Sequence, residues 1–262
     1  MPTWNPDQYL KFADERTRPC RDLAARVAVK QLRRVIDLGC GPGNSTQVLA
    51  ERWPEARITG LDSSADMIAA ARKTQLSCEW TVSDAAAWAA SAGDKFDVVF
   101  SNAAMQWLPD HGALFPKLLG RVAPGGALAI QMPANFDAPP HRLMREVAAS
   151  PEWRAKFGEG KVREWHVHDE AFYYDVLSPL AVRVDFWLTD YVHVLPDVAG
   201  IVEWYKGTGM RPFLEALGSD DDRNRFTAEY LQRLGHYYKP QQDGRVLFPF
   251  RRIFLIAYQQ NS

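Results

Sequence analysis

The sequence has little of what several classes of protein require. It contains 3 cysteines, Cys20, Cys40 and Cys78, an odd number without metal-ligand spacing. We therefore expect reduced thiols in a cytoplasmic protein, and no metal site. No apolar run approaches the roughly 20 residues that cross a membrane, and the N-terminal segment lacks the apolar stretch of a signal peptide. Neither sign of charge is in excess, since Lys and Arg number 31 and Asp and Glu number 32. This balance weighs against a nucleic-acid or anionic-membrane partner.

The chain is long enough to bury a core without disulfide or metal support. It has 262 residues, of which 47% are hydrophobic and 24% are charged, values typical of a globular protein. We see no linker that would separate two independent domains, so we expect one domain over residues 1–262. The oligomeric state is left open by the sequence, which is compatible with a monomer.

Strand-like and helix-like stretches alternate between residues 33 and 133. Apolar runs bounded by turn residues predict strands, and apolar residues at helical spacing predict the helices between them. This alternation is typical of an α/β protein with a doubly wound, mostly parallel sheet. The expected strands lie at 33–41, 56–62, 78–84, 95–103 and 127–133, and the expected helices at 44–53, 63–73 and 111–122.

The rhythm changes after Pro133. Residues 182–195 alternate like a strand, and residues 201–217 and 221–238 are predicted to be helical around a Gly-Thr-Gly loop. Residues 244–260 predict a closing strand pair or one bent long strand, with Pro249 at an edge or a bulge. We expect a cofactor-binding core at about 30–133, covered by a helical lid made from about 1–29, 134–180 and 197–243.

A glycine-rich turn follows the first predicted strand, in the segment Asp37-Leu38-Gly39-Cys40-Gly41-Pro42-Gly43-Asn44. Glycine allows a sharp turn and a close approach of a ligand to the backbone. Asp62 ends the second strand, where an acid can accept hydrogen bonds from the hydroxyls of an adenosine ribose. Asp84 ends the third strand, in a position to meet an adenine amino group.

These motifs resemble the class I S-adenosylmethionine-dependent methyltransferases. The resemblance rests on VIDLGCGPGNST, Asp62, Asp84 and the turn APGGALAI, and covers roughly residues 35–132. It implies a seven-stranded sheet with a reversed last strand and S-adenosylmethionine as the cofactor. The residues that it assigns to the cofactor are Asp37, Gly39, Gly41, Asp62, Ser63, Asp84, Ala85 and Asn102.

Four further segments are similar to the trans-aconitate methyltransferases within that class. They are YLKFADERTRP, FSNAAMQWLPDH, AIQMPANF and WYKGTGMRPFL, in this order along nearly the whole chain. The resemblance implies methyl transfer to one carboxylate of a small tricarboxylic acid, trans-aconitate, which gives a monomethyl ester and S-adenosylhomocysteine. The candidate substrate-binding residues are Tyr9, Arg16, Gln106, Trp107 and Arg211.

Several of these residues also have a physical argument of their own. Tyr9, Phe12 and Arg16 share one helix face. The Gly-Thr-Gly loop offers free backbone N–H groups before Arg211, whose guanidinium suits a carboxylate. Arg16, Arg18 and Arg251 are the alternatives to Arg211. His111 follows Asp110 at a predicted helix start, so we treat it mainly as a helix-entry residue. A substrate carboxylate with a pKa near ~4 is already ionised, so the chemistry needs no general base.

Three other functions compete with this interpretation. A methyltransferase acting on another small acid or on a phenol shares the same sheet motifs, so only the substrate-side residues would separate the two. A nicotinamide-dependent dehydrogenase is disfavoured by the G-x-G-x-G spacing and by Asp37. A non-catalytic relative that binds the cofactor is disfavoured by the intact loop and acids.

Overall fold

The computed structural model describes residues 13–30, 32–157 and 165–261, and the chain divides into two compact units. Unit 1 comprises residues 1–133, 165–189 and 252–262, and unit 2 comprises residues 134–164 and 190–251. Strands β6 (Arg183–Leu195) and β7 (Val246–Tyr258) contribute residues to both units. Unit 1 holds the glycine-rich turn and the acidic strand ends on which the cofactor prediction depends.

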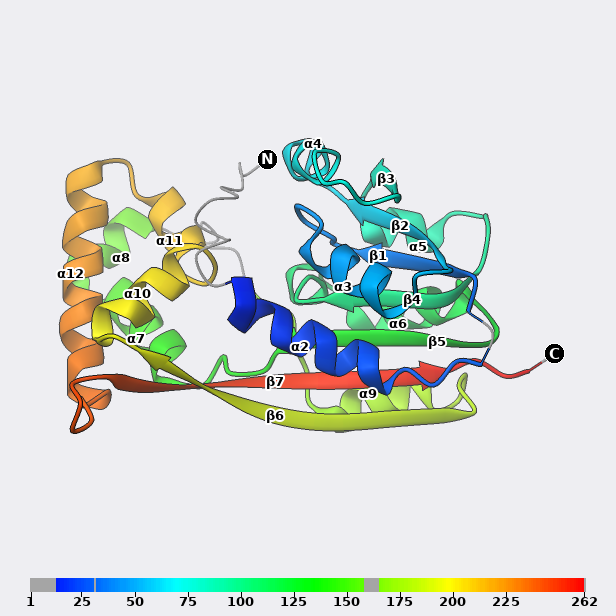
Figure 1. The fold of residues 1–262 in the computed structure, drawn as a ribbon. Helices are drawn as coiled ribbons and strands as arrows, with labels where there is room; N and C mark the ends of the chain where they lie inside the picture. Colours follow the sequence, from blue (N-terminus) through cyan, green and yellow to red (C-terminus); the bar gives the residue numbers. More distant parts are fainter. Residues whose placement is uncertain (1–12, 31, 158–164, 262) are drawn as a thin grey trace. The chain divides into compact units, whose positions relative to one another are not determined.

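Unit 1 is built on the predicted seven-stranded sheet (Figure 1). Its order is β3-β2-β1-β4-β5-β7-β6, with β1 to β5 parallel and β7 antiparallel to β5. The chain moves outward from β1 to β3 and then returns to the other side of β1 with β4. In doubly wound sheets this reversal opens a ligand-binding crevice at the carboxyl ends of the strands. The parallel strands are β1 (Arg34–Leu38), β2 (Arg57–Asp62), β3 (Glu79–Val82), β4 (Phe96–Asn102) and β5 (Val122–Pro133).

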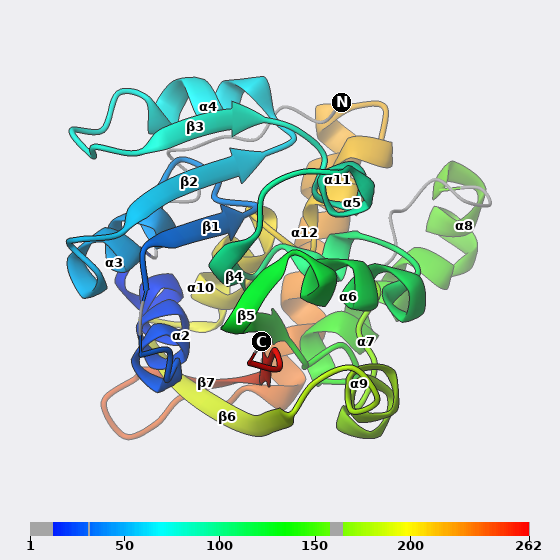
Figure 2. The same cartoon turned by 90° about the vertical axis from the view of Figure 1, so that its right-hand side faces the viewer.

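Helices cover both faces of this sheet (Figure 2). Helices α2 (Ala13–Arg26) and α3 (Asn44–Arg52) pack together on one face. The opposite face carries α5 (Ala85–Ala90), α6 (His111–Gly120) and α9 (Glu170–Leu177). Helix α4 (Ala65–Ala71) packs on β2 and β3, and a short 3-10 helix, η1 (Met105–Trp107), follows β4.

The central strands are apolar because both of their faces are covered. Val98, Val99 and Phe100 of β4 are fully buried, as are residues 127–130 of β5. Strands buried on both faces have continuous apolar sequences rather than alternating ones, which is why these strands could be predicted. Near the β3 edge of the sheet, Gly60 of β2 lies opposite Trp80 of β3. The missing side chain of Gly60 leaves room for the Trp80 ring.

The closing segment is one long strand, β7, rather than a strand pair. Its pairing with β5 ends where Pro133 lies opposite Arg252. Pro249 therefore lies in a stretch that β5 no longer flanks, and its side chain is exposed. This position explains how a proline without an N–H group is tolerated inside the strand, as an edge position predicts.

Unit 2 is mainly helical. An aromatic core joins its helices, with Trp153 against Phe226, and Phe157 and Phe226 each against Phe213. Unit 2 also contains residues 190–195 of β6 and 246–251 of β7. Between these two strands, Asp190 accepts two hydrogen bonds from Arg251, at 2.9 and 2.8 Å. The helices are α7 (Pro139–Ala149), α8 (Pro151–Phe157), α10 (Val198–Lys206), α11 (Arg211–Ala216) and α12 (Asp220–Tyr237).

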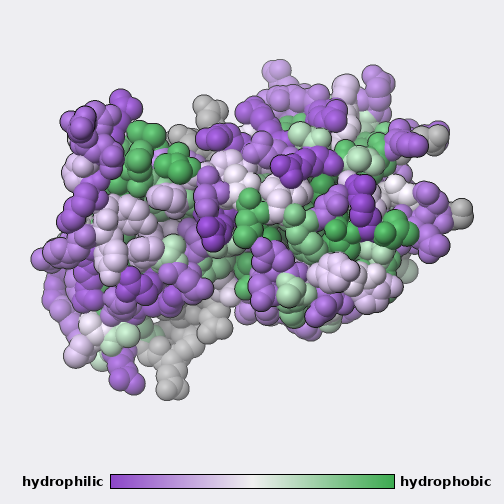
Figure 3. Space-filling view, turned by 90° about the horizontal axis from the view of Figure 1, so that it is seen from below, coloured by the Kyte–Doolittle hydropathy of each residue, from purple (hydrophilic) through white to green (hydrophobic). Residues whose placement is uncertain are grey.

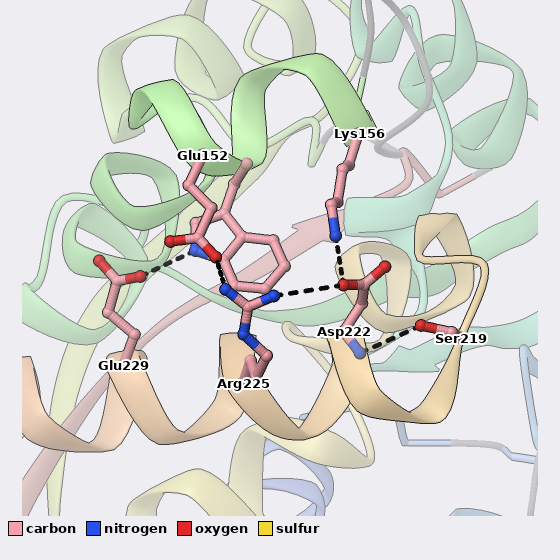
Figure 4. A network of polar contacts seen from close by, with 7 residues as sticks. Glu152, Lys156, Ser219, Asp222, Arg225 and Glu229 are labelled. Carbon is pink, nitrogen blue, oxygen red and sulfur yellow. Dashed lines mark hydrogen bonds and ion pairs between the residues drawn. The ribbon is translucent and has the colours of Figure 1, made fainter.

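A polar network joins α8 to the start of α12 (Figure 4). The carboxylate of Asp222 forms ion pairs with Lys156 and Arg225, and Arg225 also forms an ion pair with Glu152. The indole Nε1–H of Trp153 donates to Glu229 at 2.8 Å. The hydroxyl of Ser219 accepts from the Asp222 N–H and caps α12. These contacts fix the outer helix pair of unit 2 by charge as well as by packing.

The surface carries scattered apolar side chains. Leu188, Val192 and Val194 of β6 are exposed, and the face in Figure 3 mixes hydrophilic with hydrophobic areas. Scattered exposed apolar residues are ordinary on a folded protein. Within the described part of the chain, no helix is long and apolar enough to cross a membrane.

Candidate cofactor and substrate site

The glycine-rich turn after β1 is a tight loop tied to the end of β2. Gly39, Gly41 and Gly43 have φ values of 71°, 55° and 100°, which favour glycine. The N–H groups of Gly39 and Cys40 both donate to the Leu61 carbonyl, at 2.7 and 3.1 Å. The loop therefore has one conformation, set by the neighbouring strand.

The glycines of this loop serve different purposes. A Cβ at Gly39 would lie 2.2 Å from the Cβ of Ala104, so this glycine lets the turns after β1 and β4 pack together. A Cβ at Gly41 would meet no atom of the described residues within 4 Å, so within the described part of the chain the backbone there is open to a ligand. Ala103, beside Ala104, has a φ of 55°, a strained conformation for alanine of the kind that clusters at functional sites.

Asp62 ends β2 beside this loop. Its two carboxylate oxygens accept the N–H groups of Gly41 at 2.9 Å and Ser64 at 2.8 Å. A carboxylate offers about four acceptor positions, so two remain for ligand hydroxyls. Burial raises the pKa of Asp62, whereas these two backbone hydrogen bonds oppose the rise.

Asp37 lies fully buried in β1. Its Oδ2 accepts the hydroxyls of Ser45 and Thr46 at 2.6 and 2.7 Å, and these two residues begin α3. Its Oδ1 is buried and has no hydrogen-bond partner among the described residues. Burial raises the pKa of Asp37 to about 6, while the two hydroxyls favour the ionised form. Asp37 therefore fixes the loop-to-helix junction and keeps one acceptor for another group.

Asp84, Ser63 and Ala85 lie at the ends of β2 and β3. Asp84 caps α5 by accepting the Ala87 N–H at 2.9 Å, and its side chain is exposed. Ser63 is exposed and Ala85 is buried. The Ser83 N–H donates to the Asp62 carbonyl at 3.0 Å, which joins the ends of the two strands. This group forms the outer side of the same sheet edge.

Asn102, Gln106 and Trp107 follow β4. The Oδ1 of Asn102 and the Oε1 of Gln106 are buried without a hydrogen-bond partner in the part of the chain that the structure describes. Gln106 donates its Nε2 to the Ala103 carbonyl at 2.7 Å. Trp107 is half-buried and its ring lies 6.1 Å from that of Trp165. The structure thus brings Asn102 and Gln106 to the turn that packs on Gly39.

His111 is a structural residue with fixed hydrogen bonds. It is buried at the start of α6, with its Nε2 3.0 Å from the Met105 carbonyl. A carbonyl only accepts, so Nε2 carries the proton and Nδ1 accepts from the Tyr173 hydroxyl at 2.7 Å. Burial lowers the pKa of His111, which keeps the ring neutral. These contacts connect η1, α6 and α9, and agree with a role at the helix start.

Of the remaining substrate candidates, two come from the N-terminal segment and two from unit 2. Tyr9 lies outside the described residues, and Arg16 is part of α2. In unit 2, Arg211 begins α11, and its Nε donates to Glu215 Oε1 at 2.6 Å. Arg251, one of the alternatives, is engaged with Asp190.

The expectation of free N–H groups in the segment 207–211 is wrong at three positions. The N–H groups of Thr208 and Met210 donate to the Tyr205 carbonyl at 3.0 and 2.8 Å, and that of Arg211 donates to the Thr208 carbonyl at 3.2 Å. These turn hydrogen bonds, which reach back three or five residues after α10 ends, occupy the donors of Thr208, Met210 and Arg211. A Cβ at Gly209 would lie 2.8 Å from the Tyr205 ring, so this glycine serves close packing.

Two polar residues of the sheet were missed from the sequence. Gln131 of β5 is fully buried, and its Oε1 accepts from Nη1 of the buried Arg252 of β7 at 3.2 Å. The signal was present, since each interrupts an otherwise apolar strand, in ALAIQMP and FRRIFLIA. A charged or amide side chain inside such a run is seldom buried without a polar function.

The residues at this edge fit S-adenosylmethionine. Gly41 leaves backbone open to a ligand, Asp62 keeps acceptor positions beside it, and Asp37 Oδ1 is a buried acceptor of the kind that a cationic group requires. Over the described ranges, no group of three His, Cys, Asp or Glu side chains is arranged to hold a metal ion.

Comparisons with known proteins agree with this chemistry. A family profile described as "Methyltransferase domain" matches residues 35–126. A solved protein similar in fold is YcgJ of Bacillus subtilis, with 13% identity, a TM-score of 0.58, and coverage of 94% of this chain and 100% of that one. Another is the plantazolicin methyltransferase BpumL in complex with SAH, with 16% identity, a TM-score of 0.52, and coverage of 98% and 90%. The protein is an S-adenosylmethionine-dependent methyltransferase.

Relatives of higher identity extend over the whole chain. One from Azoarcus sp. (strain BH72) is 50% identical over 257 residues, 98% of this chain and 99% of its own. Others are from Rhodopseudomonas palustris (strain BisB18), 47% identical over the same shares, and Variovorax paradoxus (strain S110), 45% identical over 99% and 100%. All three are named trans-aconitate 2-methyltransferase, and this chain belongs to their family.

Proposed function

We propose that this protein transfers a methyl group from S-adenosylmethionine to one carboxylate of trans-aconitate. The products are the monomethyl ester and S-adenosylhomocysteine. The observation that carries the proposal is the 50% identity to a trans-aconitate 2-methyltransferase over 98% of the chain, far beyond the matched methyltransferase domain. Substrate-side segments are included in this match, and they separate one methyltransferase from another.

The cofactor is held by the sheet edge of unit 1 in this proposal. Asp62 binds the ribose hydroxyls, the backbone of Gly41 lies against the ligand, and Asp37 and Asn102 provide acceptors for its cationic end. Asp84, Ser63 and Ala85 lie toward the adenine. When bound, S-adenosylmethionine supplies a methyl group on a sulfonium sulfur, which can pass to a carboxylate oxygen while the S–C electron pair stays on sulfur.

The enzyme then has to orient and desolvate the substrate rather than activate it. A carboxylate of pKa near ~4 is already the nucleophile at neutral pH. Correct orientation of the reacting atoms can supply roughly 7–11 kcal/mol. His111 does not act as a base in this scheme, because both of its ring nitrogens are engaged within the core. Tyr9, Arg16, Gln106, Trp107 and Arg211 remain the proposed substrate contacts.

The three cysteines are free, which supports a reducing, cytoplasmic location. The substrate itself is tested by a methyl-transfer assay over a panel of di- and tricarboxylic acids and phenols. Trans-aconitate should have the highest kcat/KM, and mass spectrometry should find one added methyl group as an ester. A clear preference for a phenol or for another acid would refute the proposed substrate while leaving the methyltransferase class unchanged.

A further inference from the structure

The polar side chains at the carboxyl edge of the unit 1 sheet change in character from one strand to the next. In the order of the strands, the edge begins with acids, continues with amides and ends with an arginine. The residues are Asp84 after β3, Asp62 of β2, Asp37 of β1, Asn102 of β4, Gln131 of β5 and Arg252 of β7. This order runs from negative to positive charge along one line.

Four of these residues also share one face of the sheet. Asp37 lies opposite Phe100 of β4, and Asn102, two residues further on, lies opposite Gln131. Gln131 lies opposite Phe254, and Arg252 is two residues from it along β7. Because side chains alternate between the two faces of a sheet, Asp37, Asn102, Gln131 and Arg252 point the same way. This is the face that α3 covers, since Ser45 and Thr46 of α3 reach Asp37.

The two central amides leave complementary atoms unsatisfied. Arg252 donates to the Gln131 Oε1, and this hydrogen bond fixes the orientation of the amide so that Nε2 points away from Arg252. That Nε2 donor and the Oδ1 acceptor of Asn102 are both buried without a hydrogen-bond partner in the described residues. The strands lie only about 4.8 Å apart, yet the two atoms do not pair. Leaving buried polar atoms unpaired is costly, so we take each of the two atoms to serve a ligand: the Asn102 acceptor serves the cofactor, and the Gln131 donor serves an anion.

We propose that Gln131 and Arg252 form the subsite for a carboxylate of the substrate that does not react. This inference rests on the proposed function, in which the ligand is a tricarboxylate. An anion on the β5–β7 side accepts from the Gln131 Nε2 and is balanced by the Arg252 guanidinium. The acids of β1 and β2 lie on the other side of Asn102, where the cationic cofactor is proposed to bind. The charge order of the edge therefore separates the two ligands and places their reacting ends near Asn102.

The experiment compares Gln131→Met and Arg252→Gln with Gln259→Met. The methionine variant keeps the length of the glutamine and removes its donor. Gln259 is the matched control, because it also donates its Nε2, to Leu119, but lies at the opposite end of the β5–β7 pair, beside Gly126. For each protein, calorimetry measures the Kd of trans-aconitate in the presence of S-adenosylhomocysteine, and of S-adenosylhomocysteine alone. Thermal melts verify the fold.

Gln131→Met should weaken trans-aconitate binding by about 10- to 150-fold, the range expected for a lost hydrogen bond to a charged group. Arg252→Gln should weaken it at least as much, and Gln259→Met should leave it unchanged. Affinity for S-adenosylhomocysteine should stay within about twofold, because one hydrogen bond to that ligand would be worth more. For a dicarboxylate that lacks the recognised group, the loss of affinity from wild type to Gln131→Met should be smaller than the loss for trans-aconitate.

Unchanged trans-aconitate affinity in Gln131→Met and Arg252→Gln would overturn the subsite. An equal loss of affinity for both ligands would overturn it as well, since that outcome indicates a structural role. If Gln131→Met does not fold, Arg252→Gln carries the test. If the wild-type enzyme binds trans-aconitate at this pair but does not methylate it, the proposed function is refuted and the subsite is retained. A wild type that neither binds nor methylates trans-aconitate refutes both.

Discussion

Asp62 holds two backbone N–H groups and still offers acceptor positions, so we expect one carboxylate to serve both the loop and the cofactor. Asp62→Ala should weaken S-adenosylhomocysteine binding by about 1.5–3 kcal/mol, the scale of hydrogen bonds to a charged group. Calorimetric titration measures this loss. Asp66→Ala, an exposed aspartate in the first turn of α4, is the control and should keep wild-type affinity. Unchanged affinity in a folded Asp62→Ala protein would contradict the assignment.

The pKa of Asp37, raised to about 6 by burial, makes cofactor binding depend on pH. Above pH 6 the carboxylate is charged and can hold a cationic amino group, and below pH 6 it is progressively protonated. Affinity for S-adenosylhomocysteine should therefore fall between pH 7 and pH 5 in the wild type. In Asp37→Asn the affinity should be lower at pH 7, and the part of the pH dependence due to this group should disappear. An identical pH dependence in both proteins would show that Asp37 does not contact the ligand.

The same shift affects stability with a definite sign. Because the folded pKa lies above the unfolded value near 3.8, the charged form of Asp37 costs stability above pH 6. This cost decreases as the pH falls from 6 toward 4, where the native state binds a proton that the unfolded state does not. Asp37 therefore opposes the usual loss of stability on acidification.

Arg211 remains a sequence-based prediction for substrate recognition. Its guanidinium is paired with Glu215, as a surface i,i+4 pair would be. If it also holds a substrate carboxylate, Arg211→Ala should raise KM for trans-aconitate, and Arg211→Lys should restore little, because lysine lacks the planar fork. Steady-state kinetics check this, with Arg145→Ala as a control for loss of an exposed charge in the same unit. Wild-type kinetics in both Arg211 variants would assign the residue to the surface ion pair alone.

At the scale of elements, the packing of β2 against β3 depends on the absence of one side chain. A Cβ on Gly60 would lie 2.4 and 2.5 Å from ring atoms of Trp80, and the tip of that ring also approaches Gly43 of the glycine-rich loop. Gly60→Ala should destabilise the protein by about 1–3 kcal/mol through overpacking. Chemical denaturation measures the free energy of unfolding.

Two further variants make the Gly60 prediction specific. Gly120→Ala, where an added Cβ meets nothing within 4 Å, should be neutral or slightly stabilising. Trp80→Leu should reduce the cost of Gly60→Ala when both are combined, because the ring that causes the overlap is gone. Additive effects of the two substitutions would show that the overlap does not determine the stability.

For the molecule as a whole, the proposed mechanism, in which no general base is needed, predicts a simple pH profile. At saturating S-adenosylmethionine, which removes the effect of Asp37 on binding, kcat should stay nearly constant from pH 8 to pH 6. His111 is not expected to act as the base, because its ring nitrogens are held between Met105 and Tyr173, and burial lowers its pKa. A steep loss of kcat that one side chain accounts for would indicate a hydroxyl substrate and a basic residue.

The parallel sheet and the glycine-rich turn could both be predicted from local sequence. Strands buried on both faces must be apolar throughout, and a turn with three left-handed residues requires glycine, so both features are visible in local sequence. Asp37, Asp62 and Asp84 could be singled out because each lies at or just after the end of a predicted strand. The number of strands and the reversed β7 came from the family resemblance and are confirmed by the structure.

Only the tertiary structure decided which polar side chains meet. Gln131 and Arg252 are 121 positions apart, and strand pairing alone brings them together. The partners of His111 come from the start of η1 and from α9, and the N–H groups of Thr208 and Met210 are occupied because the turn after α10 brings them to the Tyr205 carbonyl. Local sequence encodes which residues can turn, extend or be buried. The hydrogen-bond partner of a buried group depends on strand order and register, which arise only when distant segments pack.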